Sequence, residues 1–133
     1  MALVSVHAEI TGSIVEAAID LHRALGPGMF ESAYELLLGD ELVRRGHAVQ
    51  RQTVVPIRFR GRLVEQAFRM DILVDDRVIV EVKSTERNSA LHRRQLLTYL
   101  RFTEREVGLV LNFGLPAMKE GIDRVLNDHA LNN

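Results

Sequence analysis

Apolar residues at helical spacing open the chain. Across residues 7–24 and just beyond, they recur every three or four positions, which predicts a helix with one buried face: Ile10, Ile14, Ala17, Ala18, Leu21 and Leu25. The run Leu25-Gly26-Pro27-Gly28 ends this helix, because glycine suits a left-handed cap and proline cannot continue a helix. A second helix is predicted over residues 30–45 and stops at Gly46. Gly39 lies inside it, at a cost of about 1 kcal/mol relative to alanine.

The middle of the chain changes to β-branched residues and strand-like alternation. Val49–Phe59 predicts a strand or a bent pair of strands, and Arg60-Gly61-Arg62 predicts a hairpin turn. Two further strands are expected at Ala67–Val74 and Val78–Lys83, joined by Asp75-Asp76-Arg77. A block of strands thus directly follows two helices.

Helical spacing returns after the strands. Residues 89–102 predict a third long helix, Val107–Phe113 predicts a last strand, and the pattern near 117–127 predicts a terminal helix. The polar end, Asn127–Asn133, is expected to fray. Because a helix connects Val78–Lys83 to the last strand, these two strands are expected to be parallel and joined by a right-handed crossover. The predicted element order is α-α-β-β-β-α-β-α.

Charged residues interrupt the two most apolar strands. Residues 78–82 form a run typical of a strand covered on both faces, but Glu81 breaks it and Lys83 follows two positions later on the same face. Asp71 interrupts the preceding strand in the same way. Buried ionisable groups are costly unless they pair or bind a metal. The strands alone support a metal site no better than a Glu81–Lys83 salt bridge, or a strand end that simply reaches water.

The length of the loop between these strands decides where Asp71 points. A two-residue loop would place Asp71 opposite Val80 and turn it away from Glu81. A three-residue loop, with Val74 paired to Val78, would place Asp71 opposite Glu81. Only the second register, or a bulge of equal effect, gathers the two carboxylates.

The length, the composition and the absence of several motifs exclude some classes of protein. A length of 133 residues suits a single domain over residues 1–133, and the absence of cysteine excludes disulfides and thiolate zinc sites. No HExxH or GxxxxGK[ST] motif is present, which argues against a zinc hydrolase and an ATP-driven motor. No apolar run approaches the roughly 20 residues that cross a bilayer, and no export signal is evident, so we expect a cytoplasmic protein and no membrane partner.

The charge balance bears on nucleic acid as a partner. The net charge is −1, with 17 basic and 18 acidic residues, whereas proteins that coat long nucleic acids usually carry a strong basic excess. A nucleic-acid substrate would therefore be held locally, by a few arginines or by a partner subunit.

Three short motifs resemble those of a known family. Asp71 followed by Glu81-Val82-Lys83 resembles the D…(D/E)xK signature of PD-(D/E)xK nucleases, and Gly28-Met29-Phe30-Glu31-Ser32-Ala33-Tyr34 is similar to the motif that names the GxxExxY proteins of that superfamily. Gln95-Leu96-Leu97-Thr98-Tyr99 resembles the QxxxY motif of its exonuclease-like branch. The resemblance runs from about His7 to about Asn127.

The resemblance implies a fold. We expect an α/β (α+β) domain with a restriction-endonuclease-like core, α-β-β-β-α-β, at about residues 28–115. Its mixed central sheet would be flanked by helices, with one extra helix at the N-terminus and one at the C-terminus.

The resemblance also implies roles for single residues. Asp71, Glu81 and Glu31 would hold Mg²⁺, or alternatively Mn²⁺, and Lys83 would position or deprotonate the attacking water or stabilise charge. The remaining residues of the motifs share supporting roles: Gln95 acts in catalysis, Tyr99 lines the site, Glu35 shares the role of Glu31 or is simply solvated, and Gly28 and Tyr34 are structural. His22 and His92 are interpreted as surface or capping histidines.

The implied function is a divalent-metal-dependent phosphodiester hydrolase that acts on DNA or RNA. The alternative is a catalytically silent nuclease-fold domain that binds nucleic acid or a protein partner. The weak overall charge favours assembly, and a homodimer is our expectation. Its surfaces would be two apolar stripes, unless these stripes complete the hydrophobic core: Ile10, Ile14 and Leu21 on the first helix, and Ile122, Val125 and Leu126 on the terminal helix.

Overall fold

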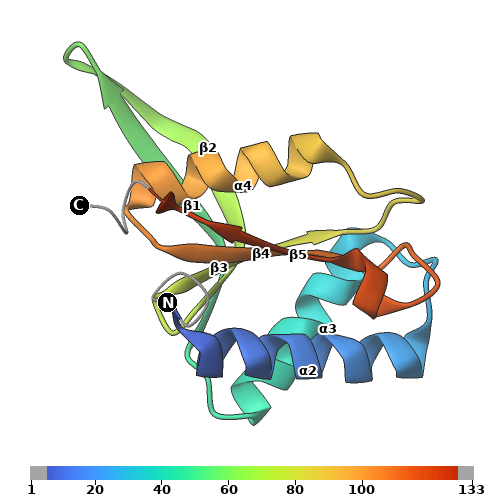
Figure 1. The fold of residues 1–133 in the computed structure, drawn as a ribbon. Helices are drawn as coiled ribbons and strands as arrows, with labels where there is room; N and C mark the ends of the chain where they lie inside the picture. Colours follow the sequence, from blue (N-terminus) through green and yellow to red (C-terminus); the bar gives the residue numbers. More distant parts are fainter. Residues whose placement is uncertain (1–5, 129–133) are drawn as a thin grey trace.

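The computed structural model describes residues 6–128, which form one five-stranded sheet between helices (Figure 1). The helices and strands have the following bounds: α2 Ala8–Leu25, α3 Glu31–Arg44, β1 Val49–Phe59, β2 Arg62–Val74, β3 Val78–Lys83, α4 Ala90–Thr103, β4 Val107–Asn112, the 3₁₀ turn η1 Met118–Gly121, and β5 Ile122–Leu126.

The strands lie in the order in which they occur along the chain, β1-β2-β3-β4-β5. Every neighbouring pair is antiparallel except β3 and β4, which are parallel and connected through α4. The predicted mixed sheet flanked by helices is therefore confirmed, as is the parallel pair. The ladder between β1 and β2 shifts its register between Val55 and Ile57, at Pro56, which cannot donate a backbone hydrogen bond.

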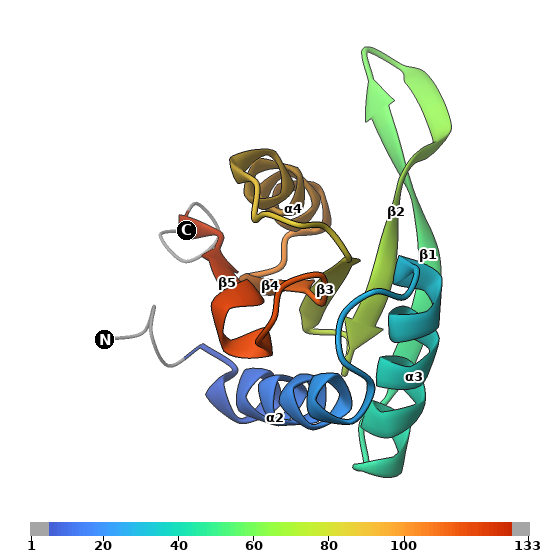
Figure 2. The ribbon, with the colours of Figure 1, turned by 90° about the vertical axis from the view of Figure 1, so that its right-hand side faces the viewer.

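Two hydrophobic cores lie on opposite faces of the sheet. Helices α2 and α3 cover one face and α4 covers the other (Figure 2). Residues of β3 alternate between the two cores, with Val78, Val80 and Val82 toward α2 and α3, and Ile79 toward α4. The predicted burial of this strand on both faces is confirmed.

The predicted terminal helix is wrong. Residues 118–121 form a single 3₁₀ turn, and residues 122–126 form β5, antiparallel to β4. The apolar spacing of Ile122, Val125 and Leu126 fits one helical turn, but it equally fits a short strand that buries residues on both faces. In the structure, Val125 packs in the α4 core, whereas Ile122 and Leu126 pack against the other core.

The C-terminal end of β5 is held firmly. Asn127 was expected to fray, yet it is buried, and its backbone N–H donates to the carbonyl of Glu106 at 2.9 Å. Its side-chain amide donates to the carbonyl of Arg105 at 3.0 Å. The rest of the expected frayed tail, from residue 129 onward, lies outside the described residues.

The apolar stripes expected to pair two copies are used inside the domain. Ile14 is fully buried, and Ile10 and Leu21 pack against the same core. Val125 is buried as well. Both stripes contribute to the hydrophobic core, which is the alternative expected from the sequence. None of the described helices combines the length and the hydropathy needed to cross a bilayer.

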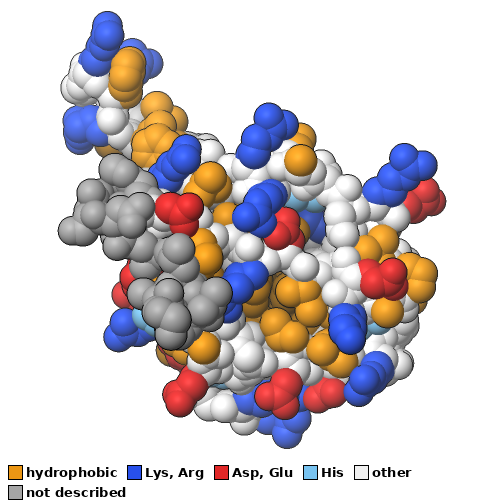
Figure 3. All heavy atoms as spheres, in the orientation of Figure 1, with side chains coloured by type: hydrophobic (Ala, Val, Ile, Leu, Met, Phe, Trp, Pro, Cys, Tyr) orange, Lys and Arg blue, Asp and Glu red, His pale blue; other side chains and the backbone are white. Residues whose placement is uncertain are grey.

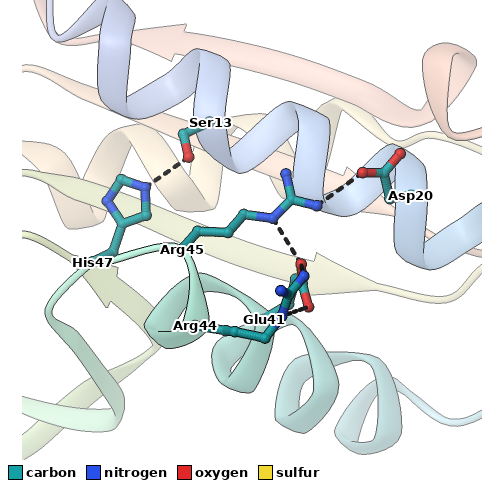
Figure 4. Close-up of polar contacts among 6 residues, drawn as sticks. All are labelled: Ser13, Asp20, Glu41, Arg44, Arg45 and His47. Carbon is teal, nitrogen blue, oxygen red and sulfur yellow. Dashed lines mark hydrogen bonds and ion pairs between the residues drawn. The ribbon is translucent and has the colours of Figure 1, made fainter.

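Polar ties fix α3 against α2 (Figure 4). The Arg45 guanidinium donates to Asp20 at 2.8 Å and to Glu41 at 2.7 Å, which joins the end of α3 to α2. Nearby, Ser13 Oγ and His47 Nε2 are hydrogen-bonded at 2.7 Å. These contacts set the position of α3, whose other end reaches the candidate site.

A second bond continues this polar chain into the β2–β3 loop, because His47 Nδ1 and Asp75 Oδ2 are hydrogen-bonded at 2.7 Å. The order Ser13–His47–Asp75 is that of a hydrolytic triad. However, Ser13 lies inside α2, where the backbone N–H groups are engaged in the helix and cannot stabilise an oxyanion. We therefore interpret the hydrogen-bonded residues Ser13, His47 and Asp75 as a structural contact between α2 and the β2–β3 loop.

Candidate metal centre

The loop between β2 and β3 has the three-residue register. Val74 pairs with Val78 and Ile72 pairs with Val80, as the longer loop requires. Asp75 and Asp76 both adopt left-handed backbone conformations, with φ of 53° and 56°, which aspartate tolerates better than most residues. The register that brings Asp71 opposite Glu81 is therefore confirmed.

Asp71 and Glu81 replace part of the ladder between the two strands. The backbone N–H of Asp71 donates to Glu81 Oε2 at 2.9 Å, and the backbone N–H of Val82 donates to Asp71 Oδ2 at 2.9 Å. Each carboxylate thus accepts the hydrogen bond that a backbone carbonyl would otherwise accept. This exchange holds the two carboxyl groups together where the strands part.

The surroundings raise the pKa of both carboxyl groups. Burial raises the pKa of Glu81 to about 8, and the charge of Asp71 adds to this effect, while the Asp71 N–H and the Lys83 ammonium oppose it. Burial also raises the pKa of Asp71, opposed by the Val82 N–H. A buried carboxyl pair with raised pKa values is a common mark of a functional site.

The alternative interpretation as a structural salt bridge receives no support. Within residues 6–128, no ion pair joins Glu81 to Lys83. Glu81 is only 3% exposed, so the strand does not simply reach water at this point. Lys83 is partly exposed at the end of β3, and its charge acts on both carboxyl groups.

Asp71 lies between two open cavities. One has a volume of about 550 Å³ and is lined mainly by the start of α3 and the preceding loop: Met29, Phe30, Glu31, Ser32, Glu35, Gln52, Asp71 and Ser84. The other has a volume of about 330 Å³ and is lined by strands β1 and β2: Gln52, Val54, Gln66, Phe68, Arg69 and Asp71. Asp71 is therefore accessible from two sides.

Tyr34 fixes the loop that leads into α3. Its ring is fully buried and stacks on Phe113 with 4.5 Å between centroids. Its hydroxyl donates to the carbonyl of Gly26 at 2.5 Å and accepts the backbone N–H of Met29 at 3.2 Å. One buried side chain thus ties together both ends of the loop.

The same loop is joined to the end of β3. Ser84 Oγ donates to the carbonyl of Met29 at 2.7 Å. Gly28 adopts a φ of 113°, a conformation that other residues rarely adopt. As a result, α3 begins beside the carboxyl pair, and Glu31 in its first turn faces the larger cavity.

Glu35 is buried and lines the larger cavity, so the alternative that it is simply solvated is wrong. Its carboxylate accepts hydrogen bonds from Arg51 at 2.8 Å and from the Gln52 amide at 2.6 Å. Gly39, one turn later, makes room for this arrangement, because a Cβ there would lie 3.0 Å from the Arg51 side chain. The glycine that seemed unfavourable in a helix thus has a packing reason.

Gln52 is a site residue that the sequence did not reveal. It has a left-handed φ of 54° inside β1, and its side chain bridges Glu35 and Arg69. It also lines both cavities. Backbone strain of this kind often lies at functional sites. A glutamine in an exposed strand gives no signal of it in the sequence.

Helix α4 covers the carboxyl pair from the other face of the sheet. Tyr99 is buried and stacks on Phe68 with 4.3 Å between centroids. Burial raises the pKa of the Tyr99 hydroxyl, and the charges of Glu81 and Asp71 raise it further. Tyr99 is therefore within electrostatic reach of the pair.

The other polar residues of α4 differ from expectation. His92, interpreted as a surface residue, is partly buried, and its pKa is lowered by burial and by the charge of Lys83. Gln95 is exposed on α4 and lines neither of the two cavities around Asp71. The structure thus brings His92 closer to the centre than predicted, and it leaves Gln95 facing solvent.

The residues present fit a hard divalent cation only in part. Asp71 and Glu81 form a carboxylate pair, and oxygen ligands of this type suit Mg²⁺. Glu31 shares the larger cavity with Asp71. In the described part of the chain, however, no three acidic or histidine side chains are placed to hold one ion together. The predicted convergence of Asp71, Glu81 and Glu31 is therefore incomplete in this geometry.

Comparisons with known proteins gave a match to a family and a weaker likeness to a solved structure. No curated protein resembles the chain closely enough to count as a match. Among solved structures, the crystal structure of SSO0001 is similar at 17% sequence identity and a TM-score of 0.46, over 92% of this chain and 82% of that one. Residues 8–125 match the family model of the PD-(D/E)XK nuclease superfamily. Since this match spans nearly the whole chain, the protein belongs to the PD-(D/E)XK nuclease superfamily.

Proposed function

We propose that the protein is a divalent-metal-dependent phosphodiester hydrolase that cleaves DNA or RNA, and that it is of the GxxExxY type. The observation that carries this proposal is the reciprocal pairing of Asp71 and Glu81 beside Lys83, at the junction of two open cavities. The loop fixed by Gly28 and Tyr34 supports the finer assignment.

Each residue of the centre has a distinct task in this proposal. Asp71 and Glu81 would hold Mg²⁺ or Mn²⁺, and Glu31 would join them from the larger cavity. A cation held there supplies charge neutralisation at phosphorus and lowers the pKa of a water molecule. Lys83 would orient that water or counter the charge on the phosphate. Tyr99 packs α4 against β2, and Gln95, on the same helical face, extends toward solvent where it can meet a substrate.

The alternative is a domain that keeps the fold and binds nucleic acid or a protein without cleaving. One observation favours it: the described residues contain no complete set of three metal ligands. The two functions differ in a single measurable property, which is cleavage that depends on a divalent cation.

A cleavage panel tests the proposal. Single- and double-stranded DNA and RNA would be incubated with the wild type and Asp71→Asn, in Mg²⁺, Mn²⁺ or EDTA. We expect cleavage of at least one substrate with a metal and none in EDTA. Asp71→Asn should lose at least about a hundredfold in rate, as expected when a group that stabilises the transition state is removed.

The matched control is Asp40→Asn, the same change at an exposed acidic residue of α3 that lines neither cavity. It should cleave like the wild type. If the wild type cleaves nothing, the binding function is the correct one. If Asp71→Asn retains the activity, cleavage does not depend on this carboxyl pair, and the assignment of the site is wrong.

A further inference from the structure

The hairpin formed by β1 and β2 projects from the body of the protein as an arm (Figure 1). Beyond the bulge at Pro56, Ile57 pairs with Val64 and Phe59 pairs with Arg62 across the turn at Arg60 and Gly61. We call residues 57–64 the arm tip. An exposed two-stranded hairpin is only marginally stable by itself, so its length calls for a functional explanation.

Apolar side chains of the arm tip face solvent. Phe59 is 66% exposed, and Leu63 and Val64 are each exposed to nearly half. Figure 3 shows hydrophobic and basic side chains together at the end of the arm, at the upper left. Exposed apolar residues gathered on one projecting element indicate a contact surface.

The arm is the basic part of an otherwise acidic protein. Residues 51–69 contain five arginines and one glutamate, a net charge of +4. The rest of the chain, with 12 basic and 17 acidic residues, therefore carries −5. This local excess is hidden in the overall net charge of −1, and it points to a polyanion as the partner.

Three of these arginines are not neutralised by acidic side chains. Arg51 pairs with Glu35 and Arg69 donates to Gln52, whereas no ion pair among the described residues involves Arg58, Arg60 or Arg62. All three of the latter lie exposed on the arm tip. Arg58 donates to the carbonyl of Gly61, and the Arg60 guanidinium lies 5.2 Å from the centroid of the Phe59 ring.

A cavity at the base of the arm reaches Asp71 of the carboxyl pair. The smaller cavity is lined by Val54, Gln66, Phe68 and Arg69 at the base of the arm, and it ends at Asp71. Arg62 and Asp71 are nine residues apart on β2, or about 30 Å in an extended strand. A polymer that runs along β2 from the tip would therefore meet this cavity before it reaches Asp71.

We propose that the arm is the element with which this protein binds single-stranded nucleic acid. Arg58, Arg60 and Arg62 contact the phosphates, and Phe59 stacks on an unpaired base, as aromatic residues do in proteins that bind single strands. The proposal rests on the proposed function, because the bound strand is the substrate that enters the cavity at Asp71. It names the part of the protein that captures this substrate.

The test measures binding of a fluorescent 30-nucleotide single strand, as DNA and as RNA, by anisotropy in EDTA. The first variant carries Arg58→Gln, Arg60→Gln and Arg62→Gln, and the second carries Phe59→Ala. The control carries Arg23→Gln, Arg77→Gln and Lys119→Gln, which remove the same charge from exposed positions outside the arm. Thermal unfolding of each variant verifies that it is folded.

We expect the triple arm variant to lose at least about tenfold in affinity and to lower the salt-dependence slope by about 2, since each phosphate contact on a single strand contributes about 0.7. Phe59→Ala should lose about tenfold through stacking. The control should change affinity by less than about threefold at equal salt, because local contacts rather than total charge carry the binding.

The proposal would be overturned if the wild type did not bind the single strand, or if the arm variant and the control lost affinity equally. It would also be overturned if the wild type were a dimer in sedimentation and the only effect of the arm substitutions were to dissociate that dimer. Magnesium titration separates this proposal from the proposed function. If the arm variants bind Mg²⁺ like the wild type but lose the single strand, the arm proposal stands by itself. If Asp71-dependent cleavage persists and the arm variants bind normally, only the arm proposal fails.

Discussion

The raised pKa of Glu81 is the clearest electrostatic feature of the candidate site at the scale of a single residue. A buried carboxyl group next to another carboxyl group has a raised pKa, because its ionised form is destabilised by burial and by the neighbouring charge. A bound cation would relieve both effects. The pKa of Glu81 is about 8 in the folded protein, against a usual value of 4.5. The folded state therefore binds more protons than the unfolded state between these values, and its stability falls as pH rises through this window.

This loss of stability with rising pH gives a first prediction. In EDTA, the free energy of unfolding of the wild type should decrease from pH 5 to pH 8 relative to that of Glu81→Gln. The difference should grow by several kcal/mol at most, since one pKa unit corresponds to about 1.4 kcal/mol. Urea denaturation at several pH values measures it. Parallel stability curves for the two proteins would show that Glu81 is not protonated in the folded state.

Metal binding should release a proton from the same residue. At pH 7, Glu81 must lose its proton before it can hold a cation, so each bound Mg²⁺ should release about one proton. Calorimetry in buffers of different ionisation enthalpy counts the protons. The affinity for Mg²⁺ should rise with pH up to about 8 for the wild type. Glu81→Gln should show neither effect; proton release that persists in this variant would assign it to another group.

At the scale of elements, the sequence predicted most of the secondary structure because its apolar periodicity matches burial. The bounds of α2, α3 and β3 are close to those predicted, and the loop length between β2 and β3 settled the register. Strand β2 begins five residues earlier than predicted. Its first residues, Arg62–Gln66, are exposed on the arm, and an element without a buried face has no apolar pattern to reveal it.

Elements defined by long-range contacts could not be predicted. Strand β5 is too short for its spacing to separate strand from helix, and it forms because the edge of β4 is available. The roles of Gln52 and His92 depend on where β1 and α4 meet the carboxyl pair, which no local pattern encodes. Motif residues such as Asp71 and Glu81 could be predicted because their charges interrupt buried strands.

The loop before α3 gives a prediction at this scale. Tyr34→Phe keeps the stacking on Phe113 but loses the hydrogen bonds with Gly26 and Met29, which should lower the free energy of unfolding by about 1–3 kcal/mol. Tyr99→Phe is the matched control, since within the described residues its hydroxyl forms no hydrogen bond. Chemical denaturation compares the two. Equal losses would mean that the Tyr34 hydroxyl does not fix the loop.

At the scale of the whole molecule, the hydrophobic cores and the basic arm occupy different parts of the protein. The two cores fix β3 from both faces, while the arm projects away from them and carries the basic charge. The overall charge of −1 does not show this local excess, although local binding by a few arginines was expected from the sequence. Because binding would be local, a small acidic domain can still hold a polyanion.

The use of the α2 stripe within the core gives a prediction for the whole domain. Ile14→Ala should lower the free energy of unfolding by about 2–5 kcal/mol, whereas Leu25→Ala, at an exposed position of the same helix, should cost less than about 1 kcal/mol. Sedimentation should be the same for both variants and the wild type. An Ile14→Ala variant of normal stability but altered oligomeric state would place α2 in an interface.

The central claim is that Lys83 acts chemically beside a carboxyl pair that holds the metal. Its most direct test measures Mg²⁺ affinity and single-turnover cleavage of an oligonucleotide on the same samples of wild type and Lys83→Met. We expect the variant to bind Mg²⁺ at least as tightly, because a positive charge near the pair is removed, while the cleavage rate falls by at least about a hundredfold. Cleavage by Lys83→Met at the wild-type rate would show that Lys83 has no chemical role.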